Sequence, residues 1–354
     1  MTIAIAISGG IDSLVAAHRV GQSGEDAFGL HFLTGYEHVP LPDIAEKIKR
    51  ISEQIHIPVH IVDLSQSFRK KVVEYFTRTY LAGKTPNPCL VCNATIKFDD
   101  LLSEARRLGA ERLATGHYAR IAEDSSSRRR LYKGADAQKD QSYFLAFLTQ
   151  SQLRRACFPL QDMTKTQVIE LASRMGLVPV SQKESQDICF IQDDYASFLL
   201  RETGFCPKPG PIADLNGKIL GEHSGLHRFT VGQRRGINCP ASEPYYVVRI
   251  DPETNRLIVG RKNQLGAREC RVTQINWIAP MPEGALRIQA RIRYRHAAVS
   301  AVLTPVNETV AQLRFDRLQY AVTPGQGAVF YQDDAVLGGG WIDSDPVFDP
   351  QGLS

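Results

Sequence analysis

The amino terminus places a short strand, two adjacent glycines and a helix in immediate succession. Isoleucines at positions 3, 5 and 7 alternate with other residues and predict a strand, and the apolar stretch 14–20 predicts a helix. The turn between them is SGGIDS, residues 8–13. A strand that passes through a glycine turn into a helix begins a βα unit, so a parallel sheet covered by helices is expected here.

The alternation of strand and helix patterns continues through the first half of the chain. Further strands are expected at 27–32, 59–64 and 112–115, and isoleucines 44, 48, 51 and 55 share one face of a helix. We therefore predict an α/β domain with a doubly wound parallel sheet at residues 1–202. Its other helical patterns lie at 98–108, 150–156, 164–175 and 195–201.

The pattern changes after Cys206, where prolines and glycines separate short extended pieces. Residues 245–250 and 256–259 are expected to form paired strands, and several more strands follow Cys270. We predict a small β-rich central domain at 203–268 and a C-terminal β barrel at 269–354.

Composition narrows the class of protein. A chain of 354 residues exceeds the usual size of one hydrophobic core, and its 43% apolar and 23% charged residues are ordinary for a globular protein. No apolar run approaches the length of a membrane span, and no signal peptide is recognised, so we expect a cytoplasmic protein. The net charge of +4 permits nucleic-acid binding without requiring it. Seven cysteines in such a chain suggest metal, redox or catalytic roles.

The SGGIDS turn is suited to bind an anion. Backbone N–H groups of Gly9 and Gly10, the start of the helix and the hydroxyls of Ser8 and Ser13 can all donate to phosphate oxygens. Asp12 fits beside a pyrophosphate if Mg²⁺ bridges them. A bare SGG turn is equally compatible with a purely structural connection.

Cysteines form the second feature. In TPNPCLVCN, residues 85–93, two prolines are expected to stiffen an extended loop that delivers the sulfurs of Cys89 and Cys92. Half of a zinc site and a redox pair are the alternatives for this C-x-x-C. Cys189, in SQDICFI, would by itself be taken for a buried core thiol. The remaining cysteines, at 157, 206, 239 and 270, are interpreted as structural.

A series of arginines near the carboxyl end of the chain is the third feature. Strand alternation over 287–295 would put Arg287, Arg291, Arg293 and Arg295 on one face, as a track for phosphates or as a solvated charged face. The run SSSRRR at 125–130 is expected to be an exposed loop.

Together these motifs resemble the tRNA-specific 2-thiouridylase MnmA family of PP-loop ATP pyrophosphatases, in the same order along almost the whole chain. The motifs are SGGIDS, TPNPCLVCN with Ile96–Phe98, ATGHYAR at 114–120, KDQSYFL at 139–145, SQDICFI at 185–191, FTVGQRRGI at 229–237 and VTPGQGAVFY at 322–331.

The resemblance implies an enzyme that uses ATP with Mg²⁺ to adenylate the 2-oxygen of the wobble uridine in glutamine, lysine and glutamate tRNAs, and then replaces it with sulfur. It implies that Cys92 is the nucleophile and that Cys189 carries a persulfide, so that a Cys92–Cys189 disulfide forms and is reduced. Recognition of a splayed-out base in the anticodon stem-loop agrees with the general habit of RNA-binding proteins.

The resemblance also assigns binding residues. The ATP-binding set comprises Ala6, Ile7, Ser8, Gly9, Gly10, Ile11, Asp12, Ser13, Phe32 and Gly116. The set for the target base and the tRNA comprises Asn87, Pro88, Cys89, His117, Lys139, Asp140, Gln141, Arg293, Tyr294 and Gln326. A cysteine desulfurase or sulfur-relay protein is the expected donor, no membrane partner is expected, and a monomer is the expected state.

Two departures from the family pattern keep alternatives open. Many members have Asp at the position of Cys89, so Cys89 either assists the nucleophile or joins Cys92 and Cys189 in holding a [4Fe-4S] cluster. The segment after the second strand is shortened to a loop at 40–43, which leaves a diverged PP-loop ligase or thiolase paralogue as a rival. A tRNA-binding module with a degenerate nucleotide site is a weaker rival, because the SGGIDS motif is intact.

Overall fold

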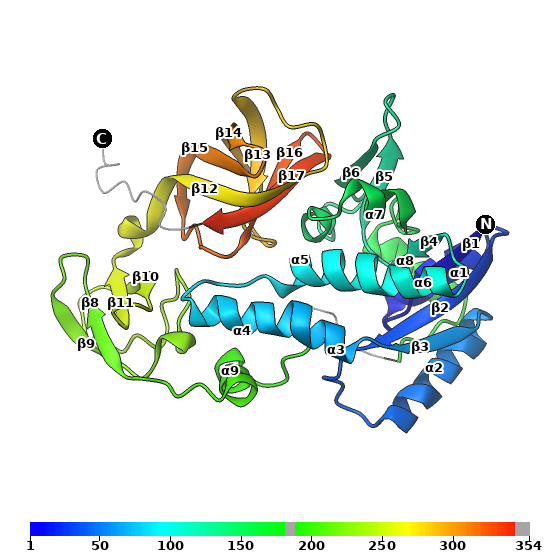
Figure 1. Ribbon diagram of the computed structural model, residues 1–354, viewed down its shortest axis with the longest axis horizontal. Coiled ribbons are helices and arrows are strands. Elements are labelled where there is room, and N and C mark those ends of the chain that lie inside the picture. Colours follow the sequence, from blue (N-terminus) through cyan, green and yellow to red (C-terminus); the bar gives the residue numbers. More distant parts are fainter. Residues whose placement is uncertain (181–187, 344–354) are drawn as a thin grey trace. The chain divides into compact units, whose positions relative to one another are not determined.

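The computed structural model describes residues 1–180 and 188–343, and the chain divides into two compact units (Figure 1). The first unit combines Met1–Val73, Pro88–Ile191 and Asp333–Leu337. The second combines Glu74–Asn87, Gln192–Gln332 and Gly338–Ser354. Each unit is therefore built from segments that are far apart in the sequence.

A five-stranded parallel sheet organises the first unit, in the order β3-β2-β1-β4-β7. The chain leaves β1 in one direction to reach β2 and β3, and then returns past β1 to β4 and β7, which makes the sheet doubly wound. This confirms the predicted α/β class. The strands are β1 (Thr2–Ala6), β2 (Asp26–Leu33), β3 (Val59–Asp63), β4 (Arg112–Ala114) and β7 (Ala156–Cys157).

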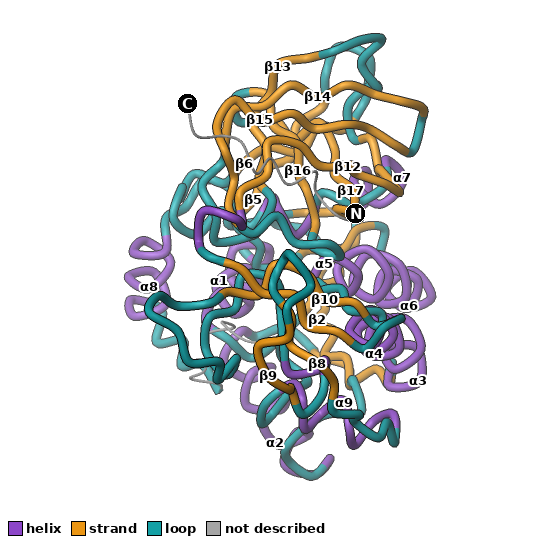
Figure 2. Tube along the Cα trace, turned by 90° about the vertical axis from the view of Figure 1, so that its left-hand side faces the viewer, coloured by secondary structure: helices purple, strands orange, loops and turns teal. Residues whose placement is uncertain are grey.

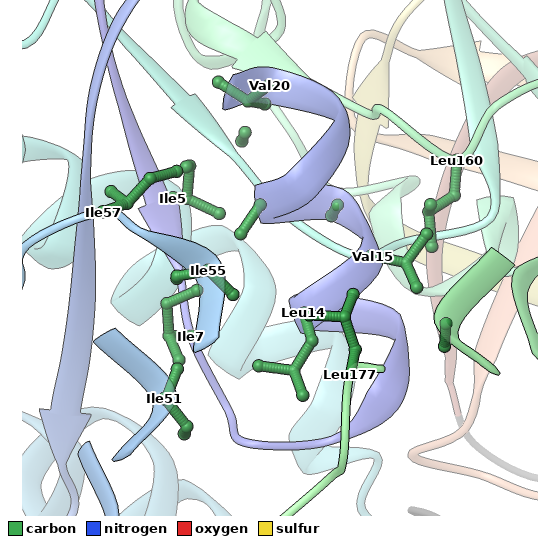
Figure 3. Close-up of a cluster of buried hydrophobic side chains, with 14 of the residues drawn as sticks. Ile5, Ile7, Leu14, Val15, Val20, Ile51, Ile55, Ile57, Leu160 and Leu177 are labelled. Carbon is green, nitrogen blue, oxygen red and sulfur yellow. The ribbon is translucent and has the colours of Figure 1, made fainter. Parts of the chain in front are cut away.

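Helices α1 (Ile11–Gly21), α2 (Leu41–Ile55) and α8 (Lys165–Arg174) bury one apolar cluster against the sheet (Figure 3). The predicted isoleucine face of α2 is confirmed, because Ile44, Ile48, Ile51 and Ile55 are all buried. The connection from β3 to β4 runs in the opposite direction, so right-handed crossover places its helices on the other face. These are α3 (Ser65–Phe68), η1 (Arg69–Val73), α5 (Pro88–Cys92), η2 (Asn93–Leu101) and α6 (Leu102–Arg107) (Figure 2).

A hairpin extends the first unit beyond its sheet. Strands β5 (Ala119–Glu123) and β6 (Arg129–Lys133) pair antiparallel, and the predicted loop 125–130 covers their turn and the start of β6. Ala335 and Val336, at the start of β17 (Ala335–Asp343), pair with Tyr132 and Leu131 of β6. Helices η3 (Ser142–Leu145) and α7 (Gln150–Arg155) follow the hairpin.

The second unit carries a four-stranded sheet and a closed barrel. The sheet has the order β10-β11-β8-β9 and encloses its own apolar cluster, with helices α4 (Glu74–Leu81) and α9 (Tyr195–Thr203) in the same unit. Its strands are β8 (Gly210–Ala213), β9 (Ile219–His223), β10 (Tyr246–Asp251) and β11 (Arg256–Gly260), with short helices η4 (Leu226–Arg228) and η5 (Lys262–Leu265).

The barrel follows the order β12-β15-β14-β13-β16-β17 and closes because β12 also pairs with β17. This confirms the expected β-rich middle and β-barrel end; the boundaries at 202 and 268 stay a prediction. The strands are β12 (Gly266–Trp277), β13 (Leu286–Arg291), β14 (Val299–Asn307), β15 (Val310–Tyr320) and β16 (Gly327–Gln332). Within the described ranges, no helix has the length and apolarity that a bilayer crossing requires.

The predicted row of four arginines on one strand is wrong. Strand β13 ends at Arg291, and Arg293 and Arg295 lie in the turn that follows. The Arg291 guanidinium donates to the carbonyl of Tyr294 at 2.7 Å, and Arg293 donates to the carbonyl of Ala321 at 2.7 Å. Loop carbonyls need donors, so Arg291 serves the turn that follows β13 and Arg293 serves the loop at Ala321. Arg287 pairs with Asp316 at 2.6 Å.

Candidate active site

The turn after β1 is held open by a glycine that no other residue could replace without strain. Gly9 has φ +82°, and a Cβ atom there would lie 2.7 Å from Cγ2 of Val180. The Ser13 hydroxyl donates to the carbonyl of Gly10 at 2.8 Å, and the Ser8 hydroxyl donates to Ser13 Oγ at 3.3 Å. The hydroxyls and the first amides of α1 therefore gather around one turn, as anion binding requires.

Gly116 closes the same site from the neighbouring strand. A Cβ atom at Gly116 would lie 2.9 Å from the backbone carbon of Asp12 and 3.1 Å from the amide nitrogen of Ser13. The structure thus brings the predicted ATP residues at 6–13 and Gly116 together at the carboxyl edge of the sheet. Phe32 lies half-buried near the end of β2, at the same edge.

Asp12 has two partners that sequence reasoning missed. Its Oδ1 accepts a hydrogen bond from the Tyr118 hydroxyl at 2.7 Å and from Lys165 Nζ at 2.7 Å. Lys165 is the first residue of α8, where Thr164 and Gln167 form a capping box. The capping pattern T-x-x-Q is visible in the sequence, but nothing local indicates that this lysine reaches a residue 153 positions away.

The site around Asp12 fits ATP with Mg²⁺. In the described part of the chain no hydrogen bond engages Asp12 Oδ2, and the Asp12 side chain is 35% exposed. Mg²⁺ at nucleotide sites takes one or two carboxylates together with phosphate oxygens and water, which this single carboxylate can provide. Lys165 supplies a cation beside this carboxylate, where it can also attract phosphate.

Cys89 and Cys92 lie on a helix, so the extended loop predicted for them is wrong. Helix α5 begins at Pro88, because proline has the φ of a helix and its missing N–H costs nothing at the first position. Residues three apart share a helix face, so both sulfurs can face one side. By residue surface area Cys89 and Cys189 are exposed and Cys92 is half-buried, yet many protein atoms surround the three sulfurs and desolvate them.

Desolvation governs the ionisation of the three thiols, and the charge of Cys189 adds to the pKa shifts of Cys89 and Cys92. The surrounding protein raises the pKa of Cys92 to about 12 and that of Cys89 to about 11, with Cys189 adding to both shifts. The pKa of Cys189 is raised as well, again mainly by burial. Cys189 therefore lies within electrostatic range of the C-x-x-C pair; residues 185–187 of that motif lie outside the described ranges.

Lys97 is the cation of this cysteine cluster, and sequence reasoning assigned it no role. Its charge lowers the pKa of Cys89, Cys92 and Cys189, which opposes the effect of burial. Helix η2 is a π-helix and begins directly after Cys92. Residues five apart lie on one face of a π-helix, so Lys97 lies on the same side as Cys92. An ammonium among thiols favours their thiolate forms.

His117 borders the same cluster. Burial lowers its pKa well below the usual value, and Lys97 lowers it further, so the imidazole is neutral near pH 7. Its Nδ1 lies 2.6 Å from the Thr115 hydroxyl. A neutral ring can exchange hydrogen bonds with a base, as the predicted tRNA contact requires.

The predicted tRNA residues 139–141 lie at a turn near the hairpin. Asp140 is buried, and its carboxylate accepts from the amide and hydroxyl of Ser142, both at 3.0 Å. The Gln141 side chain accepts from the amide of Tyr118 at 3.0 Å. Gln141 thus fixes the backbone of Tyr118, the partner of Asp12, and Asp140 fixes the turn that carries Gln141.

The remaining predicted tRNA residues belong to the second unit. Gln326 donates to the carbonyls of Thr85 at 3.2 Å and Pro86 at 3.1 Å, so the VTPGQG motif holds the segment that leads to Asn87. Asn87 is buried, and its amide donates to the Tyr75 hydroxyl at 3.2 Å. Tyr294 lies in the turn after β13 with Arg293.

A metal cluster finds no prepared site in the described ranges, where no three side chains among His, Cys, Asp and Glu converge closely enough to hold a metal ion. As arranged in the described ranges, Cys89, Cys92 and Cys189 do not form a site that fits the [4Fe-4S] cluster expected as an alternative.

Three family models match successive parts of the chain. They are described as a tRNA methyl transferase HUP domain at residues 1–193, a tRNA methyl transferase PRC-barrel domain at 197–261 and an aminomethyltransferase beta-barrel domain at 267–342. The fold and site thus define a HUP-domain protein that carries two β domains.

Curated proteins named tRNA-specific 2-thiouridylase MnmA match nearly the whole chain. The protein from Desulfosudis oleivorans is 54% identical and covers 96% of this chain and 94% of its own length. Those from Syntrophotalea carbinolica and Geotalea uraniireducens are 46% and 43% identical, each over 96% of this chain and over 98% and 94% of their own lengths. The chain belongs to the tRNA-specific 2-thiouridylase MnmA family, as its motifs predicted.

Proposed function

We propose that this protein is a tRNA-uridine 2-sulfurtransferase that converts the wobble uridine of glutamine, lysine and glutamate tRNAs to 2-thiouridine. The observation that carries the proposal is the presence, in one compact unit, of an anion-binding turn with an Asp12–Lys165 pair and of a C-x-x-C pair within electrostatic range of Cys189. Adenylation and sulfur transfer need these two sets of groups.

In the first step the nucleotide site activates the base. Uracil O2 attacks the α-phosphate of ATP, which forms an O2–AMP bond and releases pyrophosphate. Amides of the SGGIDS turn, the hydroxyls of Ser8 and Ser13 and the ammonium of Lys165 bind the departing phosphates. Mg²⁺, held at Asp12, neutralises phosphate charge when bound.

In the second step the thiols replace the oxygen. The terminal sulfur of a Cys189 persulfide attacks C2, and AMP leaves with the former O2. The Cys92 thiolate then attacks Sγ of Cys189, which releases 2-thiouridine and leaves a Cys92–Cys189 disulfide. A dithiol reductant restores both thiols, and a cysteine desulfurase or relay protein supplies the next sulfane sulfur. Lys97 favours the thiolate of Cys92.

The test is uridine-34 thiolation of transcribed lysine tRNA with ATP and a persulfide donor, measured as retardation on a mercury-containing gel. Cys92→Ser and Cys189→Ser abolish the product, and Cys157→Ser, a half-buried cysteine of the same unit, is the matched control. The absence of thiolation by the unaltered protein would overturn the proposal in favour of a diverged paralogue.

Cys89 separates the two sulfur routes. The persulfide route tolerates Cys89→Ala and works in iron-free protein. If activity requires about four irons per chain and all three cysteines, the cluster route replaces the persulfide route. Chromatography with light scattering checks the expected monomer.

A further inference from the structure

An arginine-lined cavity lies at the edge of the sheet opposite to the nucleotide site. Its volume is about 530 Å³, and we call it the arginine pocket. Met1 precedes β1 and Arg112 is the first residue of β4, so the pocket lies at the amino ends of these strands. The SGGIDS turn and Gly116 follow their carboxyl ends. The polar lining residues are Glu111, Arg112, Arg129, Ser151, Arg154 and Arg155.

The pocket is strongly positive. Four guanidiniums and one carboxylate line it. Leu113 of β4 pairs with Ala156 of β7, so Arg112 and Arg155 occupy neighbouring positions just before that pair. Like charges this close repel unless an anion lies between them.

The protein leaves hydrogen-bond donors and positive charge of these arginines without partners in the described ranges. Over residues 1–180 and 188–343, no ion pair engages Arg112, Arg154 or Arg155, and Nε of Arg112 is buried without a hydrogen-bond partner. Arg155 makes only a 3.4 Å contact with the carbonyl of Glu111, and Arg129 pairs with Glu123 at 3.0 Å. Arg154 and Arg155 lie in the last turn of α7, where a positive charge stabilises the carboxyl end of the helix. This effect does not explain the positions of Arg112 and Arg129, which lie outside the helix.

The pocket is also built to keep its shape. Gln150 of α7 binds the backbone of Arg129 on both sides: it accepts from the amide at 3.0 Å and donates to the carbonyl at 2.8 Å. Thr149 and Gln152 form a capping box at the start of the same helix. A second cavity of about 290 Å³ shares Arg112, Arg129 and Arg154. Hairpin and helix are thus fixed around one group of guanidiniums.

We propose that the arginine pocket binds backbone phosphate of the tRNA, as a contact separate from the site that holds the target base. The proposal rests on the proposed function, because that function supplies the RNA. One guanidinium can donate two parallel hydrogen bonds to the oxygens of a phosphate. A polyanion can therefore accept hydrogen bonds from several arginines that line one cavity. Arg129 at the start of β6, which the sequence alone placed in an exposed loop, thereby gains a role.

The test measures binding of full-length tRNA by filter retention between about 50 and 200 mM salt. Arg154→Gln changes an exposed side chain and should weaken binding about tenfold at low salt while lowering the slope of log K against log salt by about 1. Arg154→Glu should weaken binding further. Tm and turnover at saturating tRNA should stay unchanged, because Arg154 lies outside the catalytic groups.

Arg106→Gln is the matched control, since Arg106 is an exposed arginine in the last turn of α6 in the same unit. Equal binding by Arg154→Glu and the unaltered protein would overturn the proposal. Titration with inorganic phosphate provides a second arm: saturation of the pocket by phosphate with no effect of the variants on tRNA would show a small-anion site instead. If the unaltered protein itself fails to bind tRNA, the proposed function fails, which separates the two outcomes.

Discussion

Lys97 and Lys165 supply positive charge to the two halves of the candidate chemistry. Lys165 lies 2.7 Å from Asp12 at the phosphate-binding turn, and Lys97 lowers the pKa of all three cluster cysteines and of His117. Burial acts in the opposite direction on the thiols. The reactivity of Cys92 therefore depends on a balance between desolvation and one nearby ammonium.

Lys97→Met should slow the reaction of Cys92 with iodoacetamide. The pKa of Cys92, about 12, lies above that of a free thiol, so the thiol is protonated at pH 8 and its thiolate fraction rises tenfold per pH unit. Removal of the cation raises the pKa further, and we expect alkylation to slow about tenfold at every pH from 7 to 9. Peptide mass spectrometry follows the rate at Cys92.

Lys97→Arg serves as its control, because it keeps the charge and should retain most of the alkylation rate. An unchanged rate in Lys97→Met would contradict the electrostatic role of this lysine.

Lys165→Met should weaken ATP binding more than Tyr118→Phe. Both variants remove one donor from Asp12, but only the lysine change removes a cation from the phosphate site. We expect KM for ATP to rise about tenfold for Lys165→Met, on the scale of one charge-assisted hydrogen bond. The rate of pyrophosphate release at varied ATP gives KM for both variants. Equal effects would show that Lys165 acts only as a hydrogen-bond donor to Asp12.

At the scale of elements, the glycine turn couples β1 to the segment at 176–180. The carbonyl of Gly9 accepts from the amide of Val180 at 3.1 Å, and the Val180 side chain occupies the space where a Cβ of residue 9 would lie. The turn that binds phosphate is therefore held by a distant part of the chain as well as by its own hydroxyls.

Gly9→Ala should lower the free energy of unfolding by about 1–3 kcal/mol, because alanine disfavours a positive φ and its Cβ meets Val180. The double variant Gly9→Ala/Val180→Ala relieves the clash but keeps the backbone strain. Urea unfolding of both variants and of Val180→Ala alone separates the two costs. An additive double variant would show that the clash contributes nothing.

Periodicity in the sequence predicted elements well and misjudged their ends. The isoleucines of α2 mark their helix because a 3.6-residue repeat is local information. Pro88 was expected to hold an extended loop, yet proline is equally suited to begin a helix. The alternation of arginines in the sequence continues beyond Arg291, where β13 ends, and no local pattern marks the turn that begins there. Lys165 was missed because its contact with Asp12 depends on the tertiary fold.

At the scale of the whole molecule, the first unit needs a piece of chain from near the other end of the sequence. Ala335 and Val336 pair with Tyr132 and Leu131 of β6. A fragment of residues 1–202 would leave this edge of β6 open, and open edges promote association. We expect the fragment to form soluble aggregates larger than the full chain, as size-exclusion chromatography with light scattering would show.

The matched control for that fragment adds residues 333–337 through a flexible linker, which should restore a monomer. A fragment that is monomeric without the addition would show that the β6 edge is harmless.

The same pairing has a consequence for biosynthesis. Asp333 leaves the ribosome about 200 residues after β6, which at about 5–20 residues per second is an interval of about 10–40 s. Throughout that interval the hairpin exists without its third strand. A ribosome that stalls within the barrel would therefore release a chain with an unfinished first unit, so completion of synthesis becomes a condition for completing the part of the protein that carries Cys89, Cys92 and Cys189.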